Sequence, residues 1–369
     1  MATALLEKPE LRVEPAPEWE EPGVARTPVL LVVRPSSSGM LRHVQGLINY
    51  LPEHHFAPTL TGPDFIRDRI GLFADSRAVR ILREQARNFP IVHCHGVRAG
   101  WICAWALRNH QSWVWTVHHL LLHKSALVRA VWRWIARYPR VITAVSDSVQ
   151  AGLVRGGISP ERIEVVPGGI DLALFEQLPN RLAMRMQFHV PRDRPIVLGV
   201  GRFVPHKGFD LALKAMEHIW RTLPEADLWL AGDGPDNARL VKLSLQSSQP
   251  HHVRFFGYWG NVAELYVAAD VLVAPARDAG LGLALMEAMA CGLPVVASRI
   301  PPLERLVKHE VNGLLVPPED PVALAEAVLR LLKDHTLATE LAANARALVD
   351  RFDIRHTVAQ TAQIYRRLL

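Results

Sequence analysis

The chain has 369 residues, of which 49% are hydrophobic and 21% charged, as expected for a globular protein large enough for two domains. Its longest apolar runs are shorter than a membrane span, and its first residues are acidic and proline-rich, so we expect neither a membrane-spanning helix nor a signal peptide. The three cysteines stand in apolar contexts and are expected to be reduced, as in a cytoplasmic protein.

The net charge of +6 is unevenly distributed along the chain. Residues 1–23 contain two Lys or Arg and six Asp or Glu, whereas residues 24–180 contain 18 Lys or Arg and 10 Asp or Glu. A basic half of this kind predicts an anionic partner, either a substrate or a membrane surface. The sequence contains no zinc-finger spacing or other nucleic-acid signature, so no nucleic-acid partner is expected.

The first half of the chain alternates short apolar runs with amphipathic segments. Residues 1–26 are expected to form a disordered tail, because they are rich in Glu and Pro. The predicted strands are 29–33, 91–94, 114–117, 141–145 and 165–166, and the predicted helices are 40–51 and one that begins at Asp147 after a capping Ser146. This alternation predicts a parallel sheet with helices on both faces.

The second half repeats the alternation after a predicted connector at 175–194. Its predicted strands are 196–200, 227–231, 253–256, 270–274 and 295–297, and its predicted helices are 211–222, 236–247, 263–268, 283–290 and a last helix near 356–369. We therefore expect an α/β protein with two doubly wound, Rossmann-like domains, at 27–178 and 179–352, that face each other across a cleft. Residues 353–369 form a separate C-terminal helix in this prediction.

Charged and glycine residues follow the predicted strands of the second half. Arg202 and Lys207 come after strand 196–200, where they could neutralise a diphosphate, although two solvated surface cations are the alternative. Gly280 and Gly282 precede a helix start, whose free amides suit an anionic ligand. Glu287 lies one turn further on and points either toward the same ligand or to solvent.

Histidines mark two strand ends of the first half. His93 and His95 alternate along one strand, and His118 and His119 end the next. Such histidines can bind a metal, but no Cys, Asp or Glu recurs at a helpful spacing. A hydrogen-bonding or acid–base histidine is therefore expected instead, with a satisfied core histidine as the alternative for His93. Gly39 lies in a flexible turn after the first strand and could offer its amide to a phosphate.

The segment 124–140, KSALVRAVWRWIARYPR, has five cations and no acid, and it carries Trp132, Trp134 and Tyr138. A basic aromatic helix of this kind is typical of one that lies on an anionic membrane. An ordinary amphipathic helix whose aromatic side chains pack in the core explains the same pattern.

Nine stretches, in this order, resemble the retaining glycosyltransferases of the GT-B fold in family four (glycosyltransferase group 1), and the resemblance covers about residues 28–369. They are SSSGM at 36–40, VHCHG at 92–96, VWTVHH at 114–119, VSDS at 145–148, VVPGGID at 165–171, VGRFVPHKGFD at 200–210, AGDGP at 231–235, VRFFGYWG at 253–260 and AGLGLALMEAMACGLPVVA at 279–297.

The resemblance implies transfer of a sugar from a nucleoside-diphosphate donor, with UDP or GDP, to a hydroxyl acceptor that is a saccharide or is lipid-linked. The domain 179–352 would bind the donor, the domain 27–178 would bind the acceptor, and the helix 353–369 would cross back to the latter. No metal or other cofactor is expected, because cationic side chains neutralise the diphosphate. A cytoplasmic location is implied, with peripheral contact at the inner face of the membrane through 124–140.

The resemblance also implies roles for individual residues. Arg202 and Lys207 would hold the diphosphate, and Glu287 would bind the ribose hydroxyls. His95 would lie near the donor sugar. The other donor-binding residues would be Gly39, which adds an amide, Tyr258 and Trp259, which line the nucleobase, and Gly280, Leu281, Gly282 and Leu283, whose amides hold the sugar and phosphate.

Two positions depart from the family pattern. Gly168 stands where the family usually has Asn, and Ala279 stands where it has a glutamate that contacts donor-sugar hydroxyls. Losing that charge-assisted hydrogen bond would remove about 1.5–3 kcal/mol. The alternative function is therefore a catalytically impaired nucleotide-sugar-binding protein of the same fold. A third possibility is another chemistry on this fold, such as epimerisation of a nucleotide sugar.

Overall fold

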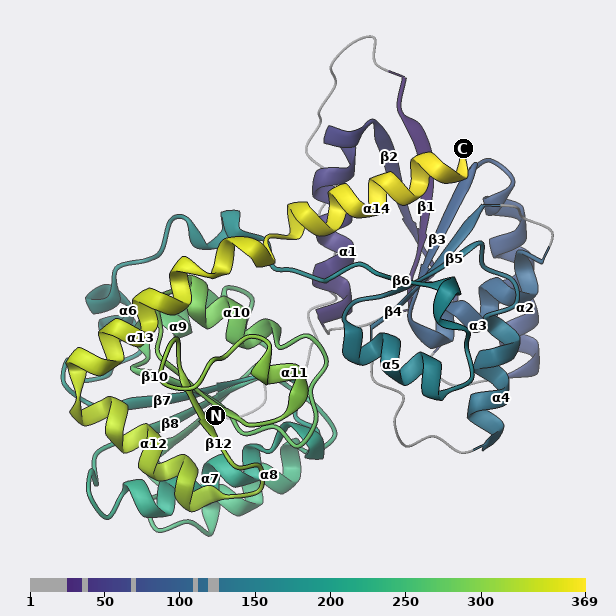
Figure 1. Cartoon of the computed structure of the whole chain (residues 1–369). Helices are drawn as coiled ribbons and strands as arrows, with labels where there is room; N and C mark the ends of the chain where they lie inside the picture. The colour runs from purple at the N-terminus through teal and green to yellow at the C-terminus, as the bar shows by residue number, and fades with distance from the viewer. Residues whose placement is uncertain (1–24, 35–38, 68–70, 109–111, 119–125) are drawn as a thin grey trace. The chain divides into compact units, whose positions relative to one another are not determined.

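The computed structural model describes residues 25–34, 39–67, 71–108, 112–118 and 126–369. These form two compact units (Figure 1). The first comprises the described residues within Met1–Ala144, Leu153–Val166 and Thr357–Leu369, and the second comprises Val145–Gly152 and Pro167–His356. The predicted disordered tail lies almost wholly outside the described residues.

The first unit is built on a six-stranded parallel sheet with the order β2-β1-β3-β4-β5-β6. Its two central strands, β3 and β4, are buried along their whole length, as expected for a sheet covered on both faces. The strands are β1 (Thr27–Val32), β2 (Phe56–Thr61), β3 (Ile91–His95), β4 (Trp113–Val117), β5 (Val141–Ala144) and β6 (Ile163–Val165).

Helices connect these strands, and the last helix of the chain packs against the same sheet. The Tyr365 hydroxyl lies 2.5 Å from Nδ1 of His93 on β3, and the Tyr365 ring packs against Phe56 on β2. The Ser146 hydroxyl accepts a hydrogen bond from the Val149 amide, which confirms the predicted cap. The helices are α1 (Gly39–Tyr50), α2 (Leu72–Ala86), α3 (Gly96–Ala106), α4 (Ala126–Ile135), α5 (Asp147–Arg155) and α14 (Ile354–Leu368), with short 3-10 turns η1 (Leu51–His54) and η2 (Pro160–Arg162).

The second unit has its own six-stranded parallel sheet, with the order β12-β11-β10-β7-β8-β9. Alternate side chains enter two separate cores, because successive residues of a strand point to opposite faces. On β7, Ile196 and Leu198 join one core and Val197 joins the other. The strands are β7 (Ile196–Val200), β8 (Asp227–Ala231), β9 (Val253–Gly257), β10 (Val271–Ala274), β11 (Val295–Ser298) and β12 (Leu314–Val316).

Helices cover both faces of this sheet, with α9 and α10 on one core and α7 and α12 on the other. Two doubly wound α/β domains are thus confirmed. The helices are α6 (Arg181–Gln187), α7 (Phe209–Ile219), α8 (Asn237–Leu245), α9 (Val262–Ala268), α10 (Leu283–Ala290), α11 (Pro301–Glu304), α12 (Pro321–Lys333) and α13 (His335–Ala347), with 3-10 turns η3 (Leu172–Phe175), η4 (Pro205–Lys207), η5 (Pro250–His252) and η6 (Val349–Phe352).

The prediction that 175–194 is a connector is wrong. The segment contains α6, and Phe175, Phe188 and Val190 are buried in a core of the second unit. Its prolines and charged residues suggested a linker, but its apolar side chains are spaced to pack against the sheet.

Candidate functional site

The strand order of the second sheet reverses between β7 and β10. Loops at the carboxyl ends of such a pair of strands usually form the ligand site of an open α/β sheet. The loop after β7 and the loop after β10 are joined here, since the Arg277 amide donates to the His206 carbonyl at 2.8 Å. They also touch at Gly208, where a Cβ atom would lie 1.9 Å from the Pro275 carbonyl oxygen.

Arg202 and Lys207 both lie in the loop after β7, at this reversal of strand order. The Arg202 side chain is exposed and Lys207 is half-buried. Neither side chain makes a hydrogen bond or an ion pair with a residue that the structure describes. Burial lowers the pKa of Lys207, and the negative charge of Asp278 works in the opposite direction. Within the described part of the chain these two cations make no direct contact with a carboxylate, and Asp278 is the one acid whose charge acts on Lys207, so both cations are suited to an anionic ligand.

A clamp that the sequence did not predict holds the two loops in place. Arg277 donates to both carboxylate oxygens of Asp210, at 2.8 and 2.9 Å, and also to Glu319 and to the Pro205 carbonyl. Burial would raise the pKa of Asp210, but the hydrogen bonds and charge of Arg277 outweigh it and hold that pKa below its ordinary value. The bidentate pair therefore fixes the segment that carries Lys207.

A row of backbone amides faces no acceptor at the start of α10. The amides of residues 280–284 donate to no acceptor among the described residues, whereas those of Leu285 and Met286 donate to the Gly282 carbonyl. Gly282 has a left-handed φ of 76°. A Cβ atom there would lie 2.6 Å from Leu306, so the turn requires glycine. This helix start is chemically suited to a phosphate.

Glu287 is not on a solvated face of α10. Its side chain is 2% exposed and accepts a hydrogen bond of 2.8 Å from the Tyr266 hydroxyl on α9. Ala279, in the loop before α10, is buried in the same core.

Tyr258 and Trp259 follow β9 and differ in their surroundings. Tyr258 is 41% exposed. Trp259 is half-buried, packs against Phe188 and Phe256, and donates its ring N–H to Glu264. Tyr258 thus has a free face, whereas the Trp259 ring is held in the core.

The order of the first sheet reverses between β1 and β3, and two predicted residues lie there. Gly39 begins α1, in the connection that follows β1. His95 ends β3 and is buried. Residues 36–38 of the predicted phosphate turn, and His119, lie outside the described residues.

The structure gives His93 and His95 different environments. Both ring nitrogens of His93 are used, since they lie 2.5 Å from the hydroxyls of Tyr365 and Thr116. Burial, with a contribution from His43, lowers the pKa of His93 to about 3. His93 is therefore the satisfied core histidine that the sequence left open.

His95 instead meets two other buried histidines. Its Nδ1 lies 3.2 Å from Nε2 of His118, which follows β4, and its ring packs against His43 of α1. Burial, followed by the charges of neighbouring histidines, lowers the pKa of His95, and burial lowers that of His43 to about 4. The sequence did not identify His43, because no motif connects it with the other two. His43, His95 and His118 each bring one ring nitrogen within 4.8 Å of the others, a grouping that can hold a metal ion.

The basic aromatic segment forms α4 and the turn after it. Trp132 and Ile135 are buried, whereas Arg133, Arg137 and Arg140 are exposed. Trp134 and Tyr138 stack with each other, and Trp134 also contacts Trp101 and Trp105 on α3. The aromatic side chains thus pack as in an ordinary amphipathic helix, and a basic strip remains outside. Among the described residues, no helix has both the length and the apolar character needed to cross a membrane.

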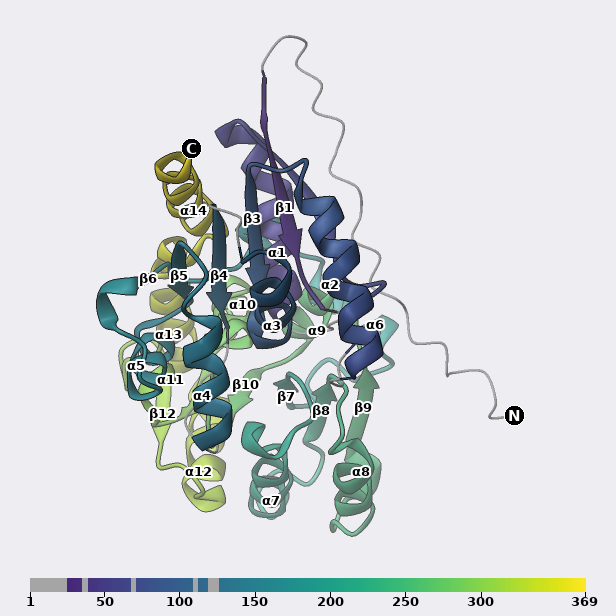
Figure 2. The same cartoon turned by 90° about the vertical axis from the view of Figure 1, so that its right-hand side faces the viewer.

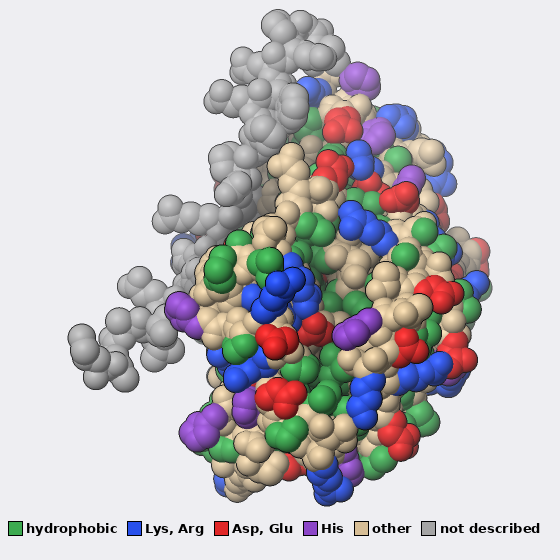
Figure 3. Space-filling model, turned by 90° about the vertical axis from the view of Figure 1, so that its left-hand side faces the viewer, with side chains coloured by type: hydrophobic (Ala, Val, Ile, Leu, Met, Phe, Trp, Pro, Cys, Tyr) green, Lys and Arg blue, Asp and Glu red, His purple; other side chains and the backbone are tan. Residues whose placement is uncertain are grey.

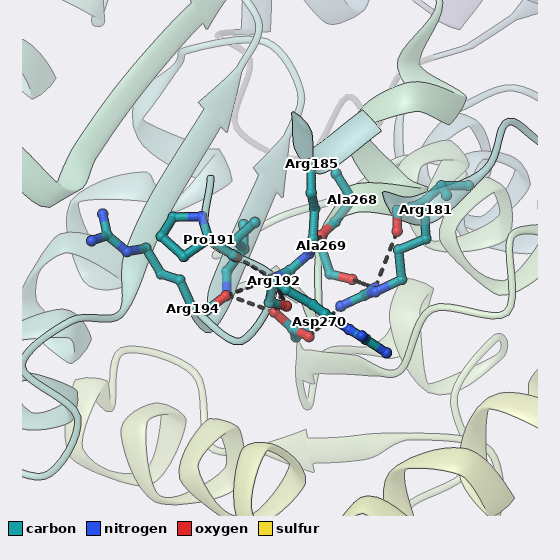
Figure 4. Close-up of polar contacts among 10 residues, drawn as sticks. Arg181, Arg185, Pro191, Arg192, Arg194, Ala268, Ala269 and Asp270 are labelled. Carbon is teal, nitrogen blue, oxygen red and sulfur yellow. Dashed lines mark hydrogen bonds and ion pairs between the residues drawn. The ribbon is translucent and has the colours of Figure 1, made fainter. Parts of the chain in front are cut away.

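A different polar network lies at the opposite, amino-terminal edge of the second sheet (Figure 4). The buried Arg185 of α6 donates to Asp270 at 2.7 Å and to the carbonyl oxygens of Pro191, Arg192, Arg194 and Ala268. A cavity of about 420 Å³ beside it is lined by Arg181, Tyr266, Asp270 and Cys291, among others. Arg181 and Arg185 both donate to Asp270 and to backbone carbonyl oxygens, so these contacts attach α6 to the sheet.

Comparison with known proteins relates the chain to glycosyltransferases. A model described as "Glycosyl transferases group 1" matches residues 180–348, and one described as "Glycosyltransferase Family 4" matches residues 29–174. A D-inositol 3-phosphate glycosyltransferase of Xylanimonas cellulosilytica is 31% identical over 333 residues, which cover 77% of this chain and 74% of the relative. One of Kineococcus radiotolerans is 33% identical over 317 residues, covering 77% and 73%.

Solved structures show the same fold. Anabaena HepE in complex with UDP-glucose has a TM-score of 0.80 at 21% identity, and the match covers 93% of this chain and 100% of that one. Sucrose-phosphate synthase from Thermosynechococcus elongatus has a TM-score of 0.79 at 26% identity, covering 93% and 99%.

Proposed function

Because the chain belongs to the group 1, family 4 glycosyltransferases of the GT-B fold, we propose that it transfers a hexosyl group from a nucleoside-diphosphate sugar to a hydroxyl acceptor with retention of anomeric configuration. One observation carries this proposal. Arg202 and Lys207, which form no hydrogen bond or ion pair with the described residues, lie in the loop after β7, and amides without an acceptor among those residues begin the helix that follows the neighbouring β10.

In this proposal the diphosphate binds Arg202, Lys207 and the amides of residues 280–283. Glu287 binds the ribose hydroxyls, and for this its carboxylate must accept from the ligand as well as from Tyr266. Tyr258 stacks on the nucleobase with its exposed ring, while Trp259 lines the base pocket from the core. UDP is the first nucleotide to test, because HepE is solved with UDP and with UDP-glucose.

The first unit binds the acceptor in this proposal and contributes two residues to the donor. Gly39 adds an amide to the phosphate, and His95 lies near the transferred sugar. Gly39 and His95 both lie where the strand order of the first sheet reverses, an edge at which such sheets bind ligands.

The proposed mechanism of sugar transfer depends on the negative charge that develops on the leaving diphosphate. As the bond between the sugar and the diphosphate breaks, the leaving group gains negative charge, which Arg202, Lys207 and the loop amides stabilise. The sugar passes through an oxocarbenium-like state. A donor phosphate oxygen takes the proton of the acceptor hydroxyl on the same face, so the anomeric configuration is retained. No step requires a metal, because the two cations neutralise the diphosphate.

A second part of the proposal is peripheral contact with an anionic membrane through α4. Three arginines, Arg133, Arg137 and Arg140, remain exposed along this helix and the turn after it, while the apolar side packs inward. Such a strip suits a protein whose acceptor is lipid-linked and presented at a membrane surface.

The test is donor binding by the full chain with Lys207→Ala. Removing one charge-assisted contact should weaken UDP about 10- to 150-fold. Lys214→Ala is the matched control, because Lys214 is exposed on α7 of the same unit. With a UDP-sugar and an accepted hydroxyl compound, wild-type protein should form a product whose anomeric proton matches the donor by NMR. Unchanged UDP affinity in Lys207→Ala would contradict the proposed site.

A catalytically impaired binding protein remains the competing function, and Ala279 is the observation that favours it. Such a protein would bind UDP with the same dependence on Lys207 but form no product with any acceptor. Donor binding and product formation therefore separate the two functions.

A further inference from the structure

Three buried histidines from separate elements of the first unit converge at one end of its sheet. His43 lies on α1, His95 ends β3, and His118 follows β4. Their ring centres are 5.6 Å (His43–His95), 4.9 Å (His43–His118) and 5.4 Å (His95–His118) apart. One nitrogen from each ring lies within 4.8 Å of the others.

The nitrogens of this cluster are not all used within the protein. Nδ1 of His43 and Nε2 of His95 are buried and have no hydrogen-bond partner among the described residues. Leaving buried polar atoms unpaired costs free energy, so a ligand for them is expected. The nearby His93 makes the contrast clear, because hydroxyl groups occupy both of its nitrogens.

The spacing of the rings matches that of imidazoles around one metal ion. A metal lies about 2.0–2.1 Å from an imidazole nitrogen, which places ring centres of a tetrahedral site about 5.2 Å apart and the nitrogens about 3.4 Å apart. The observed ring separations of 4.9, 5.4 and 5.6 Å lie on both sides of the first value. The candidate nitrogens lie within 4.8 Å of one another, so the widest pair would have to close by up to about 1.4 Å on metal binding.

We propose that His43, His95 and His118 together bind a borderline divalent ion of the Zn²⁺ or Co²⁺ class. All three ligands are imidazole nitrogens, which suit these ions, whereas Mg²⁺ and Ca²⁺ prefer oxygen. With three protein ligands the ion keeps a fourth position for water or an anion.

If the chain transfers a sugar as proposed, binding of this ion also affects the transfer. His95 is the histidine proposed to lie near the donor sugar, and metal binding occupies one of its nitrogens. The ion is therefore an inhibitor of transfer rather than a cofactor, and a chelator should restore the rate.

Metal binding is tested directly, without any assay of activity. The full chain, without a histidine tag and freed of metal by a chelator, is titrated with Co²⁺ and its visible absorption is recorded. We expect one tightly bound Co²⁺ per chain with the intense absorption of a four-coordinate ion, and displacement by Zn²⁺. The variants His43→Gln and His118→Ala should each weaken Co²⁺ by more than about tenfold, because losing a ligand costs at least as much as losing a group that supports one.

His251→Ala is the control, because His251 is exposed in the second unit and should leave the affinity unchanged. Thermal unfolding of each variant without metal shows whether it is folded. If one of the two variants does not fold, the other still tests metal binding. The proposal is overturned if the wild-type chain shows only weak, six-coordinate absorption, or if folded variants of both His43 and His118 keep the full affinity. Failure of Zn²⁺ to inhibit transfer, with binding intact, would instead contradict the role given to His95.

Discussion

Ala279 is the residue at which the second unit departs most from the family pattern. It is 4% exposed and packs in the core beneath the loop before α10. A glutamate at this position must turn its carboxylate out of that core toward the donor sugar. In the proposed site, the short side chain of Ala279 therefore lacks that hydrogen bond without leaving a charge unpaired.

Restoring the carboxylate should increase the rate of transfer. We expect Ala279→Glu to raise kcat/KM about 10- to 150-fold, the value of one charge-assisted hydrogen bond that is made in the transition state. Ala276→Glu is a matched control, because Ala276 is also buried in the same loop. The measurement is the initial rate with a saturating acceptor, together with the melting temperature of each variant. An unchanged rate in a folded Ala279→Glu variant would favour the role as a binding protein.

The position of a single residue could be predicted from the sequence where the residue lies within a few positions of a recognisable strand. Arg202 and Lys207 follow a strand within a few residues, so the position of the strand places both. Arg277 and His43 were missed, because their partners are far along the chain. Arg277 binds Asp210, 67 residues away. Such residues come together only when the strands of the sheet pair, and a short stretch of sequence does not show which strands pair with each other.

At the scale of elements, α6 shows how a polar network attaches a helix to a sheet. Arg185 is buried, and its guanidinium joins α6 to the residue before β10 and to the turn before β7. A neutral side chain at this position would leave several carbonyl oxygens without this donor, and the buried part of the Asp270 carboxylate would lose one of its cations while keeping its bonds from Arg181 and the Ile196 amide.

Replacing this arginine should therefore destabilise the second unit. We expect Arg185→Met to lower the free energy of unfolding by about 3 kcal/mol, at the low end for a broken buried pair because Asp270 is partly exposed. Arg192→Met, at an exposed arginine in the same turn, should change it by less than about 0.5 kcal/mol. Urea unfolding followed by far-ultraviolet circular dichroism gives both values. Equal stability of the two variants would show that the network contributes little.

The elements that the sequence did not reveal include two of the four edge strands, β2 and β12. β2 contains Pro58 and its middle residues are only partly buried, and β12 has three residues. Apolar runs predicted all the central strands and the edge strands β6 and β9, whereas β2 and β12 lack a long enough apolar run. The loops that carry Arg202, Lys207 and residues 280–283 follow the central strands β7 and β10, whose positions were predicted.

For the whole molecule, the two sheet orders decide where chemistry can occur. Each sheet reverses its strand order once. The predicted residues that follow the central strands β1, β3, β7 and β10 lie at those reversals. The sequence could suggest this arrangement because each motif directly follows a strand.

The charge of the surface is a separate property of the whole chain. On the face drawn in Figure 3, Lys and Arg side chains are interspersed with Asp and Glu. The strip along α4 differs from such a mixture, since residues 126–140 include no acid.

This strip should bind the protein to anionic vesicles. Each basic residue near such a surface contributes about 1 kcal/mol, so reversing two charges in Arg133→Glu/Arg137→Glu should weaken binding at least about 30-fold. The control is Arg221→Glu/Lys242→Glu, which makes the same change of net charge at exposed positions of the second unit. Sedimentation with phosphatidylserine vesicles at low salt measures the bound fraction, which should fall at high salt as the charges are screened. Equal loss in both double variants would mean that net charge, and not α4, controls the contact. No binding by the wild-type chain would remove the membrane from the proposal and leave the site in the second unit unaffected.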